Sequence, residues 1–281
     1  MNRAALLMCA SVVVLSAACD DKKTEQPVTT STSTSTPAAS APAAATTSAA
    51  APAASSAVKD SPPPGTARFA VMMGKGTFLI DAPLEKIKGM SDEVRGNVDV
   101  DVKDLSKSRG QIMVRVSTLK TSTFGDADKD TAQTEHARNW MEVGLEASAA
   151  TRMKHEWAIL TITSLECTPA ALADAKEGEP GKGVRVVKAK VSGDFALHGV
   201  TSKKTAIPVT ATFKGPADAP TELNLKTDAP MAVSLKEHDI KPRDAIGGFL
   251  NGALDRIGKK IDDKVQVSFD ATGKISMPAH P

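Results

Sequence analysis

Residues 187–213 read VKAKVSGDFALHGVTSKKTAIPVTATF, and this stretch carries the pattern that decides the fold. Apolar and polar residues alternate on both sides of the dipeptide His198–Gly199, which predicts two half-buried β-strands joined by a tight turn. The alternating apolar residues are Val187, Ala189, Val191, Phe195 and Leu197 before the turn, and Ile207, Val209, Ala211 and Phe213 after it. We therefore interpret the stretch as a β-hairpin that buries one face, with residues 198–201 in a structural, turn-forming role.

The same alternation recurs through most of the remaining chain. Further apolar runs with a period of two, or close to it, lie at residues 69–80, 97–102, 111–117, 157–165, 223–225, 231–235 and 265–269. Turns rich in Gly, Pro and Asp, such as Lys214–Pro216, separate them. Eight or more short strands joined in this way are typical of an all-β antiparallel barrel or sandwich.

Two stretches have helical spacing instead. Residues 130–143 predict a short helix between strands. In residues 246–261 one apolar stripe is formed by Ile246, Phe249, Leu250, Ala253, Leu254, Ile257 and Ile261. This second helix either packs on the outside or end of the barrel as core or forms a lid over an internal cavity, and the sequence leaves open whether such a lid moves.

The first nineteen residues have the features of an export signal. Residues 1–18 contain one arginine, an apolar run too short to span a bilayer, and small residues before Cys19, as in a bacterial lipoprotein signal peptide. Ser16-Ala17-Ala18-Cys19 resembles the lipobox, in which the chain is cut before the cysteine and its sulfur receives a diacylglycerol group. We predict that Cys19 anchors the chain to a bacterial membrane, inner or outer, on the periplasmic side of the cell envelope. The alternative is an ordinary signal peptide in which Cys19 is incidental.

Residues 19–64 follow as a low-complexity segment of Ala, Ser, Thr and Pro. Such a composition cannot bury enough apolar surface to offset its ordering entropy, which predicts a disordered tether, although an interaction region is the alternative. Residues 65–281 then form a single domain.

Composition excludes several function classes. The net charge is +2 from 35 basic and 33 acidic residues, and only 3% of residues are aromatic with no tyrosine, which disfavours nucleic acid as a partner. The chain has no HExxH pair, no nucleophile elbow and no glycine-rich phosphate loop, so we expect no catalytic residue, no metal and no cofactor. We interpret the histidines, which are His136, His155, His198, His238 and His280, as scattered and exposed.

The segment Ser192–Lys204, SGDFALHGVTSKK, resembles the YceI-like family, which shows a strand of the form G-x-L-T-[LI]-H-G-V-T-[KR]. Weaker matches follow the family order at residues 116–121, 136–143, 240–247 and 261–267, so the similarity spans residues 67–270. The resemblance implies an eight-stranded antiparallel lipocalin-like β-barrel with one or two short helices. It also implies a periplasmic protein whose apolar interior holds an isoprenoid, quinone-like chain or another lipid.

The inward-facing residues either line such a cavity or fill the barrel, and the scarcity of aromatic rings favours an open interior. The candidate ligand-binding residues of the barrel lining are Val100, Ile112, Val114, Val116, Leu160, Ile162, Val191, Phe195, Ile207, Val209, Phe213, Val233 and Val267. By their place in the matched motifs, Arg138, Trp140, Arg243 and Asp244 are the candidates for contact with a polar head group.

These features together predict a membrane-anchored, non-enzymatic carrier or sequestering protein for an apolar chain. The alternative is a filled barrel that acts as an envelope interaction or scaffold module, with a protein partner and no small-molecule ligand. Pairing of two barrels into a homodimer is left open.

Overall fold

The computed structural model of the chain describes residues 62–81, 86–179, 181–241 and 263–277. The predicted signal peptide, Cys19, the tether, Arg243, Asp244 and the predicted helix at residues 246–261 lie outside the described residues.

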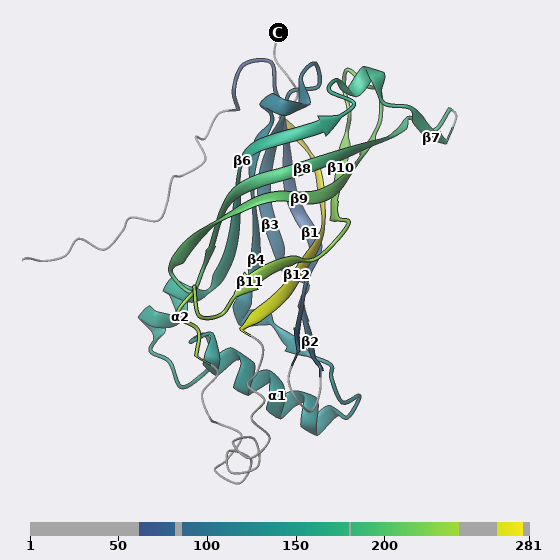
Figure 1. Cartoon of the computed structure of the whole chain (residues 1–281). Helices are drawn as coiled ribbons and strands as arrows, with labels where there is room; N and C mark the ends of the chain where they lie inside the picture. The colour runs from purple at the N-terminus through teal and green to yellow at the C-terminus, as the bar shows by residue number, and fades with distance from the viewer. Residues whose placement is uncertain (1–61, 82–85, 180, 242–262, 278–281) are drawn as a thin grey trace, which may run out of the picture. The chain divides into compact units, whose positions relative to one another are not determined.

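Eight antiparallel strands form a closed ring (Figure 1). In ring order they are β1 (Ala67–Asp81), β3 (Val94–Val100), β4 (Arg109–Arg115), β6 (Trp157–Thr168), β8 (Val184–Leu197), β9 (Val200–Lys214), β10 (Glu222–Thr227) and β12 (Lys264–Met277). The ring closes because β12 pairs with β1, which places Val267 opposite Phe78. The all-β, eight-stranded antiparallel barrel is thus confirmed.

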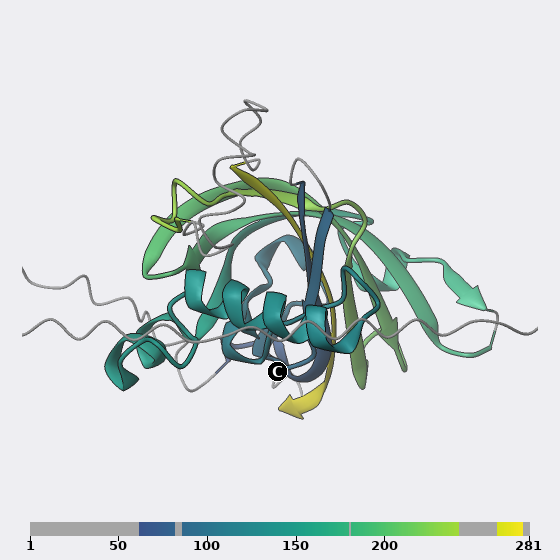
Figure 2. The ribbon, with the colours of Figure 1, turned by 90° about the horizontal axis from the view of Figure 1, so that it is seen from below.

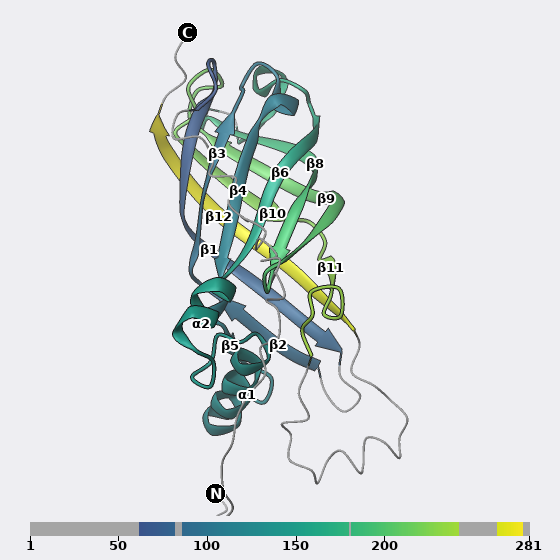
Figure 3. The same cartoon turned by 90° about the vertical axis from the view of Figure 1, so that its left-hand side faces the viewer.

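Four shorter strands extend the ring where its long strands reach past their neighbours (Figures 1 and 3). Strand β2 (Lys86–Ser91) pairs with the second half of β1, and β5 (Lys120–Thr121) pairs with β2. Strand β11 (Met231–Ser234) pairs with the start of β12, and β7 (Glu177–Glu179) with the start of β8. Three single 3-10 turns, at Leu105–Lys107, Val116–Thr118 and Leu172–Asp174, lie in the connections.

Two helices connect β5 to β6 and lie at one end of the barrel. Helix α1 (Ala127–Trp140) begins at Asp126, whose side chain accepts a hydrogen bond from the Lys129 N–H, and α2 (Ala149–His155) begins in the same way at Ser148. Seen from below, α1 crosses the mouth of the barrel (Figure 2). A helix is confirmed in the region predicted at residues 130–143, but both of its ends lie three residues earlier: the Asp126 cap starts it at Ala127, and it ends at Trp140. No helix in the described ranges is long and apolar enough to cross a bilayer.

The core lies inside the barrel, where the apolar side chains of the alternating strands meet. Phe69, Val187, Val209, Leu223 and Val233 are almost wholly buried, and the rings of Phe69 and Phe213 pack edge to face across 6.5 Å. The alternation is interrupted where β8 and β9 change register between Val191 and Gly193. At this bulge Ala206 adopts a left-handed backbone with φ +54°, and the Ser192 hydroxyl accepts a hydrogen bond from its N–H.

Candidate ligand cavity

A cavity of about 140 Å³ occupies the helix-covered end of the barrel. Its walls come from β1, β4, β6, β8, β11 and β12, and α1 covers it through Ala137, Trp140 and the adjoining Met141. The residues that line it are almost all apolar, so a bound molecule would meet mainly hydrocarbon. Strands alternate their side chains across the sheet, which is why residues two apart, such as Ile112 and Val114 of β4 or Val265 and Val267 of β12, recur in this lining.

A second cavity of about 50 Å³ lies in the same barrel interior, between strands β3, β6, β8, β9 and β10. Val100, Val191 and Val209 line it, together with the half-buried thiol of Cys167. Phe269 of β12 lines both cavities, so this residue lies between the two spaces. Burial raises the pKa of the Cys167 thiol, which keeps it protonated near neutral pH.

The structure places nearly all of the predicted lining residues on one of these cavities. The larger is lined by Ile112, Val114, Val116, Leu160, Phe195, Val233 and Val267, and the smaller by Val100, Ile162, Val191, Val209 and Phe213. Ile207 is buried in the core but borders neither. Sequence reasoning missed the covering residues Ala137 and Met141 as well as Phe78 and Leu119, although the spacing of Ala137 and Trp140 on one helix face was a usable signal.

The predicted head-group residues separate in the structure. Trp140 is buried at the end of α1 and lines the larger cavity, and its indole Nε1 makes no hydrogen bond with any described residue. Arg138 lines neither cavity because its guanidinium donates to the carbonyl oxygen of Leu119 at 3.0 Å and pairs with Glu135 at 3.0 Å. Arg243 and Asp244 are outside the described residues.

One charged residue, Arg115, borders the larger cavity among otherwise apolar side chains. Its guanidinium Nη1 lies 3.0 Å from the Glu93 carboxylate, and its Nε donates to Glu156 at 2.7 Å. Hydrogen bonds to Glu93 and then to Glu156 raise the pKa of Arg115 further above its usual range. The two carboxylates, of which Glu93 also pairs with Arg95, therefore compensate this charge at the barrel wall, and the cavity keeps an apolar character.

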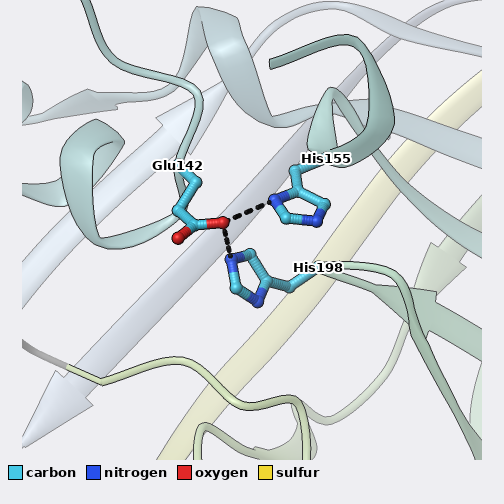
Figure 4. A group of neighbouring side chains, drawn as sticks. All are labelled: Glu142, His155 and His198. Carbon is cyan, nitrogen blue, oxygen red and sulfur yellow. Dashed lines mark ion pairs between the residues drawn. The ribbon is translucent and has the colours of Figure 1, made fainter. Parts of the chain in front are cut away.

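The expectation of scattered, exposed histidines is wrong for three of them. His155, at the end of α2, and His238 are buried, and the side chain of His198 is almost so. The rings of His155 and His198 lie 4.0 Å apart beside Glu142 (Figure 4). His198 reaches this position because it opens the β8–β9 turn with a left-handed backbone, φ +53°, followed by Gly199 at φ +76°. Burial lowers the pKa of His155, and the neighbouring His198 ring lowers it further.

His238 has a structural role within this arrangement. Its Nδ1 lies 3.1 Å from the carbonyl oxygens of Leu197 and Val200, and its Nε2 lies 3.1 Å from the Ser202 hydroxyl. Burial lowers the pKa of His238, so the neutral ring holds the segment after β11 against the β8–β9 turn.

Comparison with protein families matches residues 66–273 to the YceI-like domain. Among solved structures, a polyisoprenoid binding domain from Saccharophagus degradans is 12% identical, with 74% of this chain and 98% of that chain covered and a TM-score of 0.44. Burkholderia cenocepacia BcnA is 12% identical over 71% and 95% of the two chains, with a TM-score of 0.43. The Campylobacter jejuni YCEI protein is 9% identical over 66% and 83%, with a TM-score of 0.36. Comparison with curated proteins finds no match.

Proposed function

This chain belongs to the YceI-like domain family, and from that premise we propose that its barrel binds a long apolar chain, either the isoprenoid tail of a quinone or another lipid. The observation that carries the proposal is the apolar cavity beneath α1. The binding is non-covalent and serves transport or sequestration of the lipid.

The size of the cavities favours a narrow, linear ligand. A barrel of eight strands is either filled by side chains or holds one small ligand, and here about 140 Å³ stays free. An engineered apolar cavity of about 150 Å³ in another protein remains dry and binds benzene, so the larger cavity accepts a first segment of hydrocarbon. Movement of the Phe269 ring would join the larger cavity to the smaller one, and only a thin chain could occupy both cavities.

Trp140 gives the ligand an orientation. Its indole N–H is buried at the α1 end of the cavity, and a buried donor without an acceptor costs about 1–3 kcal/mol. A carbonyl or hydroxyl oxygen on the ligand can accept this hydrogen bond. We infer that the head group lies beneath α1 and that the apolar tail extends toward Phe269.

We further propose that Cys19 carries a lipid anchor and that residues 19–64 tether the barrel at a periplasmic membrane surface. The lipobox-like residues 16–19 and the Ala, Ser, Thr and Pro composition that follows support this placement. An intact-mass measurement of the envelope-derived chain checks it. We expect cleavage before Cys19 with the added mass of acyl chains, and a Cys19→Ala chain without that addition; an unmodified Cys19 would contradict the anchor.

Tryptophan fluorescence tests the cavity. The chain has two tryptophans, and Trp157 lies against Arg95 and Arg115, whereas Trp140 lines the larger cavity. In a Trp157→Phe chain, we expect a long-tailed ubiquinone to quench the Trp140 emission until one quinone is bound per chain. The matched Trp140→Phe chain, which keeps Trp157, should show much weaker quenching. Equal quenching of both chains would place the quinone outside the cavity and contradict the proposal.

A further inference from the structure

Three side chains from distant parts of the chain converge beside the larger cavity (Figure 4). The Nδ1 atom of His155 lies 3.2 Å, and the Nε2 atom of His198 lies 3.3 Å, from the same oxygen, Oε2 of Glu142. All three of these atoms lie within 4.8 Å of one another. Both ring nitrogens are buried, and each faces the Glu142 carboxylate.

The second ring nitrogen of His198 fixes the orientation of the ring. This nitrogen, Nδ1, lies 3.1 Å from the carbonyl oxygen of His238. A carbonyl oxygen can only accept, so His198 Nδ1 donates this hydrogen bond, and the opposite ring nitrogen, Nε2, points at the Glu142 carboxylate.

The dimensions fit a transition-metal ion. Zn²⁺ binds histidine nitrogen at about 2.0–2.1 Å and carboxylate oxygen at about 2.0–2.2 Å, so adjacent ligand atoms of a tetrahedral site lie about 3.3 Å apart. The separations of 3.2 and 3.3 Å around Glu142 match that spacing. Two histidines and one glutamate are also a known zinc-ligand set, which leaves a fourth position for water or another ligand.

The surroundings supply what such a site needs. The hydrogen bond from His198 Nδ1–H to the His238 carbonyl is the outer contact that metal-bound histidines usually make, since it fixes the ring orientation. The Glu142 side chain is 34% exposed, so an ion can reach the cluster from solvent.

We propose that Glu142, His155 and His198 together bind one divalent transition-metal ion of the Zn²⁺ class. This ion joins three elements, because Glu142 follows α1, His155 ends α2 and His198 opens the β8–β9 turn. Met141 and Leu197, the residues immediately before two of the ligands, line the larger cavity. The metal therefore ties the end of α1, which covers the cavity, and the end of α2 to the rim of the barrel.

The test uses the untagged full chain after treatment with EDTA and dialysis. Calorimetric titration with Zn²⁺ should show one ion bound per chain, and Co²⁺ should develop the visible absorption of a tetrahedral site. Glu142→Gln and His198→Asn should each weaken Zn²⁺ binding by roughly tenfold or more. Asparagine is chosen at position 198 because it tolerates the left-handed backbone of the turn.

Two control variants make the same chemical changes outside the cluster. Glu146→Gln alters an exposed carboxylate, and His136→Asn alters a half-buried histidine of α1. Both should bind Zn²⁺ as the unmodified chain does. Absence of Zn²⁺ binding, or equal binding by Glu142→Gln and the unmodified chain, would overturn the proposal. If His198→Asn fails to fold, Glu142→Gln alone tests the metal site. The Glu142 side chain is partly exposed and is replaced by one of equal size, so this variant should fold.

Discussion

The guanidinium of Arg68 and the carboxylate of Asp99 meet between β1 and β3 in two hydrogen bonds, of 2.6 Å to Oδ1 and 2.8 Å to Oδ2. Their side chains are only 8% and 7% exposed. The two residues lie directly opposite each other in the strand pairing, so the ion pair specifies the register of β1 against β3. Strand β1 is also the strand that closes the barrel against β12.

Breaking this buried pair should destabilise the barrel strongly. Asp99→Ala removes a partner of a buried guanidinium, and such a change typically costs about 3–5 kcal/mol. We expect the midpoint of urea unfolding to fall accordingly, without a change in the slope of the transition.

The exposed pair of Lys86 and Asp81, with side chains 65% and 48% exposed, provides the control. Asp81→Ala should cost less than about 1 kcal/mol, because solvent already screens that pair. Similar losses for Asp81→Ala and Asp99→Ala would mean that the buried ion pair contributes no special stability.

Filling the larger cavity should block binding. Val114 is half-buried and lines that cavity, so Val114→Phe places a ring in free space. We expect the affinity for a long-tailed ubiquinone to fall by roughly tenfold or more. The free energy of unfolding should fall by no more than the roughly 1–3 kcal/mol that overpacking of a core typically costs. Equilibrium binding and urea unfolding measure the two effects separately.

A matching change in the smaller cavity tests how far the ligand extends. Val209→Phe should weaken binding of a long-tailed ubiquinone while leaving a short-tailed one unaffected, because only the long tail passes Phe269. Loss of both ligands to the same extent would indicate general damage to the fold, and loss of neither would confine the ligand to the larger cavity.

The hydrogen bond proposed for Trp140 can be measured by ligand comparison. Trp140→Phe keeps an aromatic ring but removes the buried N–H, which should cost a quinone or an isoprenoid alcohol about 0.5–1.5 kcal/mol, or roughly two- to tenfold in affinity. A hydrocarbon such as squalene has no acceptor and should bind both chains about equally well. If the affinity for squalene fell equally, the effect would come from the shape of the ring and not from the indole N–H.

Cys167 reports on the smaller cavity. Because burial raises the pKa of its thiol, little thiolate exists at pH 8, and we expect alkylation by iodoacetamide to be roughly tenfold slower than in a short peptide of the same sequence. The rate should rise with pH as the thiolate forms, and bound long-tailed lipid should slow it further. Peptide mapping by mass spectrometry follows this cysteine alone, and alkylation at the rate of the free peptide would contradict its burial.

The alternation in residues 187–213 was sufficient to predict the β8–β9 hairpin and its turn, because burying one face of a strand requires a period of two. It could not reveal the bulge at Ala206, opposite Ser192, since a bulge depends on the partner strand. Strands β2, β5 and β11 were likewise not distinguished as extensions of the ring, because they depend on how far β1 and β12 reach past their neighbours.

The lining was predictable and the histidine cluster was not. Inward-facing residues follow from strand period alone, and of the predicted lining residues only Ile207 borders neither cavity. Glu142, His155 and His198 share no short spacing motif, because a helix end, a post-helix turn and a hairpin turn bring them together. The left-handed backbones at Glu142 and His198 were equally invisible in the sequence.

Native mass spectrometry of the full chain purified from cells that produce isoprenoid lipids, followed by organic extraction, tests lipid binding most directly. The account predicts one apolar molecule bound per chain, recovered by extraction and absent from the Val114→Phe chain. A bare polypeptide mass that stays unchanged after incubation with ubiquinone and with envelope lipids would contradict lipid binding and favour a barrel that acts through protein partners.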